Sequence, residues 1–319
     1  MSFIFLIIGF SFLIKGADIF VEGASTIAKK FNVPSMVIGL TIVAMGTSAP
    51  EAAVSITSSL AGQNDMSIAN VVGSNFFNIL VVLGVSSIIA KLPVQKDTIK
   101  NDTPFLIFIS LLLVVLGLDL NLGRIDGFIL LGLFVLFLIN TVKSGIKSTN
   151  SDINTSSSEA AVAIDASLDK PISIPRTILI CIVGSIGIIF GGDLVVNSAT
   201  SIATSFGMSS NLVGLTIIAV GTSLPEFVTS VVAIKKGETD IAIGNVIGSN
   251  IFNILLVLGL ASFIHPISMS TLALIDIIFM FAITVLLYMF IKKDNSLIKK
   301  QGILLVILYI AYMIFTIFR

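Results

Sequence analysis

Two acidic residues, Glu51 and Glu226, lie in the middle of long apolar segments of this 319-residue chain. If such a segment crosses a bilayer, a carboxylate in it costs roughly 2.5 to 3.5 kcal/mol on insertion scales, so it normally faces a bundle interior or a water-filled cavity. Glu51 and Glu226 are therefore the first candidates for a functional site. A structural hydrogen bond between two helices is the alternative role for each of them.

Both glutamates belong to stripes of oxygen-bearing residues at helical spacing, since residues three or four apart share one face of a helix. In the first half of the chain the stripes comprise Thr41, Ala44, Thr47 or Ser48, Glu51 and Ser55, and then Asn70, Ser74 and Asn78. In the second half they comprise Thr216, Ala219, Thr222 or Ser223, Glu226 and Ser230, and then Asn245, Ser249 and Asn253. Carboxylate, hydroxyl and amide oxygens are hard ligands, which suit sodium or calcium better than they suit soft metals.

The charge of these stripes narrows the choice of ion. Two carboxylates carry two negative charges, which a single Ca²⁺ or a pair of Na⁺ ions would cancel. Mg²⁺ gives up its water shell reluctantly and requires tight octahedral geometry, whereas calcium tolerates irregular oxygen cages. Calcium and sodium are similar in size, so we expect one site that hosts either ion in turn.

A proline, Pro50 or Pro225, precedes each glutamate. Proline has no N–H to donate, and its ring clashes with the carbonyl four residues back. We therefore expect the first helix of this kind to be kinked or unwound around residues 46–48, and the second helix at the equivalent place. Carbonyls near Ala44 and Ala219 should then lose their intrahelical partners and face an ion, which is tolerated at membrane depth where a cavity is lined. A kink that only shapes helix packing is the alternative.

The composition predicts an integral membrane protein. Hydrophobic residues make up 55% of the chain and charged residues only 11%, and the mean hydropathy is +1.10. A soluble chain carries about 25% charged residues. Lys plus Arg and Asp plus Glu both number 18, so no basic excess suggests a nucleic-acid partner. The single cysteine and single histidine, Cys181 and His265, exclude an internal disulfide and a His-rich zinc or haem site.

The apolar runs are long enough for ten membrane crossings of about 20 residues each. The predicted helices are 2–27, 33–60, 66–90, 103–120, 125–142, 174–203, 208–233, 239–264, 268–291 and 301–318. Residues 144–174 are rich in Ser, Thr, Asn and Asp, which predicts a flexible cytoplasmic linker. This linker separates an N-terminal half, residues 1–143, from a C-terminal half, residues 175–319.

The positive charges predict the orientation of the chain. With the N-terminus outside, 15 of the 18 Lys and Arg residues fall in inside loops, while Arg124 and Arg319 fall outside and Lys15 lies in the first helix. Lys and Arg accumulate in cytoplasmic loops. We therefore expect a multi-pass protein of the plasma membrane with both termini extracellular.

An internal duplication underlies the two halves. GLTIVAMGTSAPE and NVVGSNFFNILVVLG in the first half recur as GLTIIAVGTSLPE and NVIGSNIFNILLVLG, at a constant offset of 175 residues. Comparing residues 34–84 with 209–259 gives 27 identities in 51 positions, far more than shared membrane composition would produce. Each half holds five predicted helices, and an odd number makes the second half enter from the opposite side. Inverted repeats of this kind are typical of secondary transporters.

The first helix of each half keeps the same offset, so that Asp18 aligns with Asp193. In the first helix Lys15, Asp18 and Glu22 lie three and four residues apart. This spacing allows an ion pair within that helix, which we favour over the alternative role of guiding ions.

The repeated motifs resemble the two alpha-repeats of the calcium/cation antiporter superfamily, and specifically the prokaryotic type of sodium/calcium exchanger. GTSAPE and GSNFFN carry the resemblance in the first repeat, at about 33–90, and GTSLPE and GSNIFN carry it in the second, at about 208–264. The resemblance spans nearly the whole chain. It implies an all-α membrane protein of ten helices in two inverted five-helix repeats. It also implies electrogenic exchange of Na⁺ for Ca²⁺ by alternating access.

The resemblance also implies a set of metal ligands. Matched position by position, they are the carbonyls of Ala44 and Ala219 and the side chains of Thr47, Ser48, Glu51, Ser74, Asn78, Thr222, Ser223, Glu226, Ser249 and Asn253. The glutamates, threonines and carbonyls would serve both ions, and the serines would favour sodium. Some relatives have aspartate where this chain has Asn253. An asparagine cannot take up or release a proton as an aspartate does, so we expect no role for a proton at this position.

Other functions remain open. The same fold could couple calcium to protons or add potassium, and a passive cation channel would also use oxygen ligands. An enzyme is not expected, since no nucleophile and base pair or nucleotide loop is evident. We expect no cofactor, with Na⁺, Ca²⁺ and membrane lipid as partners and no obligate protein partner or nucleic acid.

Overall fold

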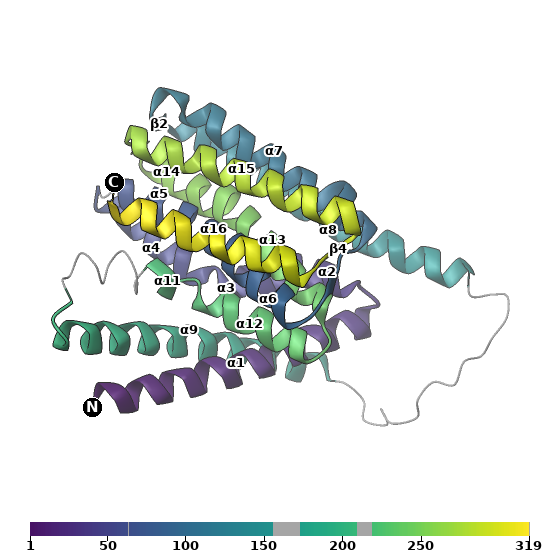
Figure 1. The fold of residues 1–319 in the computed structure, drawn as a ribbon. Helices are drawn as coiled ribbons and strands as arrows, with labels where there is room; N and C mark the ends of the chain where they lie inside the picture. Colours follow the sequence, from purple (N-terminus) through teal and green to yellow (C-terminus); the bar gives the residue numbers. More distant parts are fainter. Residues whose placement is uncertain (63, 156–172, 209–218, 319) are drawn as a thin grey trace.

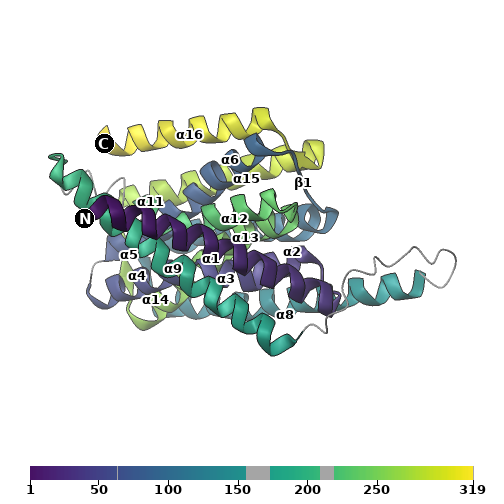
Figure 2. The ribbon, with the colours of Figure 1, turned by 90° about the horizontal axis from the view of Figure 1, so that it is seen from below.

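The computed structural model describes residues 1–62, 64–155, 173–208 and 219–318, which are almost entirely helical (Figure 1). The α-helices are α1 (Ser2–Phe31), α2 (Ser35–Ile38), α3 (Ala44–Thr47), α4 (Ala49–Leu60), α5 (Asn64–Phe76), α6 (Leu83–Ile89), α7 (Thr103–Leu116), α8 (Arg124–Thr155), α9 (Ile174–Ser205), α11 (Ala219–Gly221), α12 (Leu224–Lys235), α13 (Thr239–Phe252), α14 (Gly259–Ile264), α15 (Thr271–Asp294) and α16 (Lys299–Phe318). The π-helical segments are η1 (Gly39–Val43), η2 (Phe77–Val82), η3 (Thr98–Asp102) and η6 (Asn253–Leu258), and η4 (Gly117–Asp119) is a 3₁₀ turn. The long helices form one bundle, and both termini lie at the same end of it (Figures 1 and 2).

The apolar helices make the chain a multi-pass membrane protein. Within the described ranges eight helices are long and apolar enough to cross a bilayer, and the bent pair Ser35–Thr47 with Ala49–Leu60 counts as a ninth. The seventh predicted helix, 208–233, lies partly outside the described residues, and α11 and α12 are its described part. The first part of the predicted linker continues α8 to Thr155, and residues 156–172 lie outside the described residues.

Two helices occupy the centre of the bundle. In the spans Met66–Ile89 and Thr239–Ile264, 72% and 78% of the most apolar window is buried, against 33% or less in the other long helices. These central spans are α5–η2–α6 and α13–η6–α14, and they carry the repeated Asn and Ser stripes. The outer helices instead expose large apolar residues, as lipid contact requires. The polar stripes are thus enclosed by protein.

Helices α1 and α9 pack closely along their length through glycines. A Cβ added at Gly16 would lie 2.7 Å from the backbone N of Ile188, and one added at Gly191 would lie 2.5 Å from the backbone N of Leu13. Ser2 Oγ and Ser201 Oγ lie 3.0 Å apart near the end of the pair, so the two helices run antiparallel. Small residues allow membrane helices to approach this closely.

The acidic residues of α1 contact α12 rather than Lys15. Lys236 Nζ lies 2.9 Å from Asp18 Oδ1 and 3.5 Å from Glu22 Oε2. The predicted ion pair between Lys15 and these acids is therefore wrong in its partner. The reason is tertiary: the turn after α12 brings Lys236 against the side of α1.

Short antiparallel strands join the two halves at the loops. β1 (Leu92–Pro93) pairs with β4 (Ser296–Leu297), and β2 (Asn121–Leu122) pairs with β3 (Ile267–Ser268). Leu92, Leu122, Ile267 and Leu297 are fully buried. These pairs fix the connections around the central spans.

Candidate functional site

The predicted helix break lies directly before the first glutamate. α3 ends at Thr47, α4 begins at Ala49 with Pro50 in its first turn, and the two helical segments meet at 49°. This confirms the break expected around residues 46–48. The carbonyl of Ala44, however, still accepts the N–H of Ser48 at 3.0 Å, so the expected loss of its partner is wrong. The Thr47 hydroxyl also lies 3.3 Å from this carbonyl, so the second lone pair of the carbonyl is available to an ion only while that hydroxyl donates elsewhere.

Glu51 lies fully buried between the two halves of the chain. Its Oε1 accepts hydrogen bonds from Ser74 Oγ and Ser223 Oγ, each at 3.3 Å. Ser74 belongs to α5, and Ser223 directly precedes α12. The two serines also contact each other, with 2.9 Å between their Oγ atoms.

Glu226 has the matching environment. It is also fully buried, and its Oε1 accepts Ser48 Oγ at 3.0 Å and Ser249 Oγ at 3.5 Å. Each glutamate is thus contacted by one serine from its own half and one from the other half.

Two asparagines donate hydrogen bonds to the backbone carbonyls of the two glutamates. Asn70 Nδ2 donates to the carbonyl of Glu51 at 3.2 Å and to Ser55 Oγ at 2.8 Å. Its Oδ1 accepts from Thr222 Oγ1 of the other half at 3.4 Å.

Asn245 repeats this arrangement in the second half. Its Nδ2 donates to the carbonyl of Glu226 at 3.4 Å and to Ser230 Oγ at 3.0 Å, and its Oδ1 accepts from Thr47 Oγ1 at 3.0 Å. Each asparagine therefore ties a threonine of one half to a glutamate of the other.

Four buried oxygens of the site have no hydrogen-bond donor among the described residues: Glu51 Oε2, Glu226 Oε2, Asn78 Oδ1 and Asn253 Oδ1. All four are acceptors. A buried acceptor without a donor costs about 1 to 3 kcal/mol, and a hard cation would satisfy several of them together. The donor set, two carboxylates and two amide carbonyls with hydroxyls around them, fits Ca²⁺ or Na⁺.

The structure brings together most of the predicted site residues. Buried in one network are Thr47, Ser48, Glu51, Ser74, Asn78, Ser223, Glu226, Ser249 and Asn253. Ala44 is buried beside them on α3, and Thr222 is half-buried at the edge of the network. Ala219 begins α11 at the border of the described residues, and the structure does not describe its side chain.

Several polar residues of the site were not predicted as ligands. Asn75 and Asn250 connect the central spans, since Asn253 Nδ2 donates to Asn75 Oδ1 at 3.0 Å and Asn78 Nδ2 to Asn250 Oδ1 at 3.3 Å. The sequence does single them out, because Asn75 and Asn250 occupy the same position of the repeated GSN motif. The π-helical turns that begin at Phe77 and Asn253 leave no sequence signal, although such turns are frequent at functional sites.

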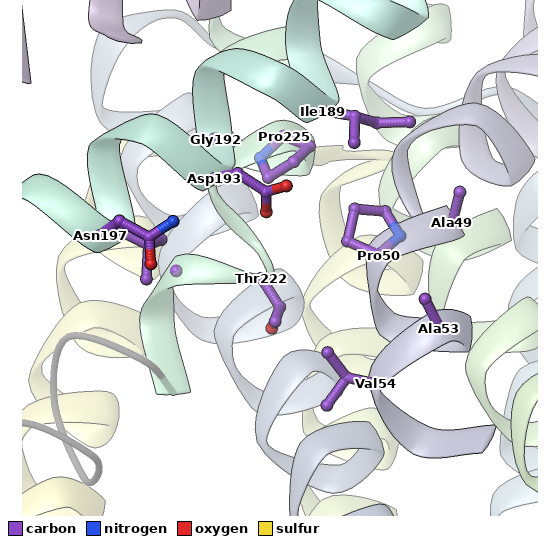
Figure 3. Close-up of a pocket in the computed structure, with 12 residues that line it drawn as sticks. Ala49, Pro50, Ala53, Val54, Ile189, Gly192, Asp193, Asn197, Thr222 and Pro225 are labelled. Carbon is purple, nitrogen blue, oxygen red and sulfur yellow. The ribbon is translucent and has the colours of Figure 1, made fainter. Parts of the chain in front are cut away.

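A cavity of about 340 Å³ lies beside this network, between α9 and α4. Asp193 and Asn197 of α9 face Pro50 and Val54 of α4 across it, with Thr222 between them (Figure 3). Its lining residues are Ala49, Pro50, Ala53, Val54, Ile189, Gly192, Asp193, Val196, Asn197, Gly221, Thr222 and Pro225. The cavity lining thus includes both prolines that precede Glu51 and Glu226. We call it the access cavity.

Comparison with known proteins identifies the family. The sequence profile described as "Sodium/calcium exchanger protein" matches residues 1–143 and 176–318. The chain belongs to the sodium/calcium exchanger family. The putative antiporter CaxA of Alkalimonas amylolytica is 40% identical over 313 residues, covering 97% of this chain and 96% of that relative. The sodium/calcium exchanger MaX1 of Methanosarcina acetivorans is 32% identical over 342 residues and covers 98% of each.

The solved structures of relatives agree with this assignment. The sodium/calcium exchanger from Methanococcus jannaschii superposes with a TM-score of 0.84 at 33% identity, covering 98% of this exchanger and 97% of that chain. Members of the family are cation antiporters rather than enzymes. The exchanger is therefore an ion-transporting membrane protein.

Proposed function

We propose that this protein exchanges Na⁺ for Ca²⁺ across the membrane, with Glu51 and Glu226 as the shared ligands. The observation that carries the proposal is the pair of fully buried glutamates, each with one carboxylate oxygen that lacks a donor among the described residues. Two such charges are costly at membrane depth unless they are paired with cations or protonated. One Ca²⁺, or a pair of Na⁺ ions, would neutralise them in the same oxygen cage.

The further ligands in this proposal are those expected from the sequence. Asn78 and Asn253 offer free amide oxygens. The remaining candidates are Ser48, Ser74, Ser223, Ser249, Thr47, Thr222 and the carbonyls of Ala44 and Ala219. The serines contact both glutamates across the halves, so an ion of either kind would draw the halves together.

Alternating access and inverted topology are part of the same proposal. Glu51 and Glu226 have equivalent surroundings built from both halves, which is the arrangement expected when two inverted repeats meet at a midplane site. In this arrangement ten helices form two five-helix halves, 1–143 and 175–319, joined by the 144–174 linker. We further propose that exchange is electrogenic and that both termini are extracellular in the plasma membrane.

Uptake of ⁴⁵Ca²⁺ into Na⁺-loaded proteoliposomes tests the proposal, with K⁺ and pH gradients imposed in separate arms. Glu51→Gln and Glu226→Gln should each abolish Na⁺-driven uptake, and Asp97→Asn, which changes an exposed carboxyl far from the site, is the matched control. Near-normal uptake in both glutamine variants would refute the proposal. Uptake that follows the K⁺ or the proton gradient instead of the Na⁺ gradient would retain the site assignment but show that K⁺ or H⁺ is the coupling ion.

A further inference from the structure

Asp193 is an exposed carboxylate in the middle of a membrane-spanning helix. It lies in α9, which spans Ile174–Ser205. Its side chain is exposed, and it has no ion-pair or hydrogen-bond partner among the described residues. A carboxylate at that depth is tolerated where it meets water or a partner charge. Its side chain lines the access cavity (Figure 3). Water in the access cavity would supply that environment.

The aligned residue of the first half has the opposite environment. Asp18 pairs with Lys236 at 2.9 Å, and α1 packs along α12 at this place. The position that aligns with Lys236, at the offset of 175, is Ala61. At the aligned position the first half thus has alanine in place of the lysine that neutralises Asp18. Where α1 meets α12, the corresponding helices α9 and α4 are separated by the access cavity.

The position of the cavity connects Asp193 with the ion site. Thr222 lines the cavity and also donates to Asn70 at 3.4 Å. Pro50 and Pro225 line it too, and the next residue after each is a site glutamate. The cavity lining therefore includes the residue that precedes each of the two site glutamates.

We propose that Asp193 is an entry residue of the exchanger, which concentrates hydrated Na⁺ and Ca²⁺ in the access cavity before they reach Glu51 and Glu226. This inference rests on the proposed function. Of the two aligned aspartates, Asp193 would act on ions because no lysine neutralises its charge among the described residues. Asp18 would not, because Lys236 neutralises it.

The charge of Asp193 sets the size of the effect. At about 6 Å, the spacing of residues one helical turn apart, a unit charge in water changes the local concentration of a monovalent ion about threefold. The factor for a divalent ion is the square of that for a monovalent one, so removing the charge should weaken Ca²⁺ entry by up to about ninefold. Salt should suppress both effects, since the Debye length at 0.15 M is only about 8 Å.

Thiol chemistry measures this potential without relying on transport. The sole cysteine, Cys181, is buried, so Cys181→Ser supplies a background for Asn197→Cys, one turn from Asp193. With each rate expressed relative to that reagent's rate with a free thiol in solution, a cationic methanethiosulfonate should modify the new thiol about tenfold faster than an anionic one, because the reagents differ by two charges. Adding Asp193→Asn should abolish that preference. Ser201→Cys, about 12 Å from Asp193 along the helix, is the control and should show a much weaker preference.

The reactivity outcomes decide the proposal. A thiol at position 197 that reacts with neither reagent would mean that the cavity is filled by lipid, and equal rates with both reagents would mean that Asp193 sets no potential there. Either result overturns the proposal. These measurements stand even if the protein proves not to exchange Na⁺ for Ca²⁺, so failure of the two proposals can be told apart.

Transport kinetics supply the second readout. In Asp193→Asn the half-saturating Ca²⁺ concentration should rise more than that of Na⁺, with the maximal rate less affected, and the difference should shrink when choline chloride raises the ionic strength. The charge-swap variant Asp193→Asn with Asn197→Asp should restore Ca²⁺ half-saturation toward the original value. A swap that fails to restore it, or a defect that is independent of salt, would indicate a structural role for Asp193 and overturn the proposal.

Discussion

The hydroxyl of Thr47 donates to Oδ1 of Asn245 across the two halves of the chain, at 3.0 Å. A threonine hydroxyl has one proton and two lone pairs. Asn245 Oδ1 is the nearest acceptor for that proton, ahead of the carbonyls of Val43 and Ala44 at 3.2 and 3.3 Å, and a proton donated to Asn245 leaves the lone pairs for a cation. Asn245 in turn donates to the carbonyl of Glu226. The contact therefore orients a candidate ligand of one half by the backbone of the other half's glutamate.

The first prediction concerns this link. Asn245→Ala leaves Thr47, Ser230 and the Glu226 carbonyl without their common partner. Since a buried group without its hydrogen bond costs about 1 to 3 kcal/mol, and about 1.4 kcal/mol is a factor of ten, half-saturating Ca²⁺ should rise by about 5-fold to about 140-fold in ⁴⁵Ca²⁺ uptake. Thr57→Ala is the control, because that exposed hydroxyl of α4 bonds only to its own helix.

A double-mutant cycle separates the link from simple damage. Thr47→Val and Asn245→Ala should together cost less than the sum of their separate effects, with a coupling of about 1 kcal/mol for a hydrogen bond. Strict additivity of the two losses would show that the Thr47–Asn245 contact contributes nothing.

The second prediction concerns ion selectivity at the serines. Ser223 Oγ lies between Ser74 Oγ and Glu51 Oε1, at 2.9 and 3.3 Å. Ca²⁺ draws most of its binding energy from the carboxylates, whereas Na⁺ depends more on each neutral oxygen. Ser223→Ala should therefore raise the half-saturating Na⁺ concentration about tenfold, on the scale of one hydrogen bond to a charged group, and that of Ca²⁺ less.

Its control is Ser110→Ala, which removes a buried hydroxyl that bonds only within α7. Measuring Na⁺-dependent and Ca²⁺-dependent rates on the same vesicles gives the ratio directly. An equal loss for both ions would remove the assignment of the serines to sodium.

The sequence singled out most of the residues that meet in this candidate site because they recur at a fixed offset; their role as ligands stays a prediction. Glu51 and Glu226, with the Ser and Asn stripes, could be placed on helix faces by spacing alone, and Pro50 located the break at Ser48. Tertiary contacts could not be predicted in the same way. Lys236, which is far from Asp18 in the sequence, pairs with it across the fold. The spacing of Lys15, Asp18 and Glu22 does not predict this contact.

The hydrogen-bond roles of the asparagines were also beyond the sequence. Spacing places Asn70 on the stripe of Ser74 and Asn78, but it does not show that Asn70 donates to a backbone carbonyl while Asn78 keeps a free oxygen. That distinction depends on which neighbour each amide meets after the two halves have packed.

The third prediction concerns the glycines between α1 and α9. Gly191→Val would place a Cβ 2.5 Å from the backbone N of Leu13 and 2.8 Å from the carbonyl of Gly9. Backbone atoms cannot yield, so the helices must separate, and overpacking of this kind costs about 1 to 3 kcal/mol or more. Thermal unfolding in detergent should occur at a clearly lower temperature, and transport should fall with it.

Gly132→Ala is the matched control, because nothing lies within 4 Å of the Cβ it would add to α8. Alanine also favours a helix over glycine by about 1 kcal/mol, so this variant should unfold no earlier than the original protein. If Gly191→Val unfolds at the same temperature as Gly132→Ala, the close packing of α1 on α9 is not needed for stability.

The fourth prediction concerns Asn253, whose Nδ2 donates to Ser74 Oγ at 3.1 Å and to Asn75 Oδ1 at 3.0 Å. In Asn253→Asp an ionised carboxyl loses both donations and places a negative oxygen against Asn75 Oδ1. Protonation restores one O–H donor and returns the site to two negative charges. Uptake by the variant, relative to the original protein, should therefore rise as the pH falls.

The measurement is Na⁺-driven ⁴⁵Ca²⁺ uptake across a pH series with equal pH on both sides of the membrane. Asn253→Ala, which also lacks the donor but cannot be protonated, should show no such relative rise. A pH profile of Asn253→Asp parallel to that of the original protein would mean that the donations from Asn253 do not control the site.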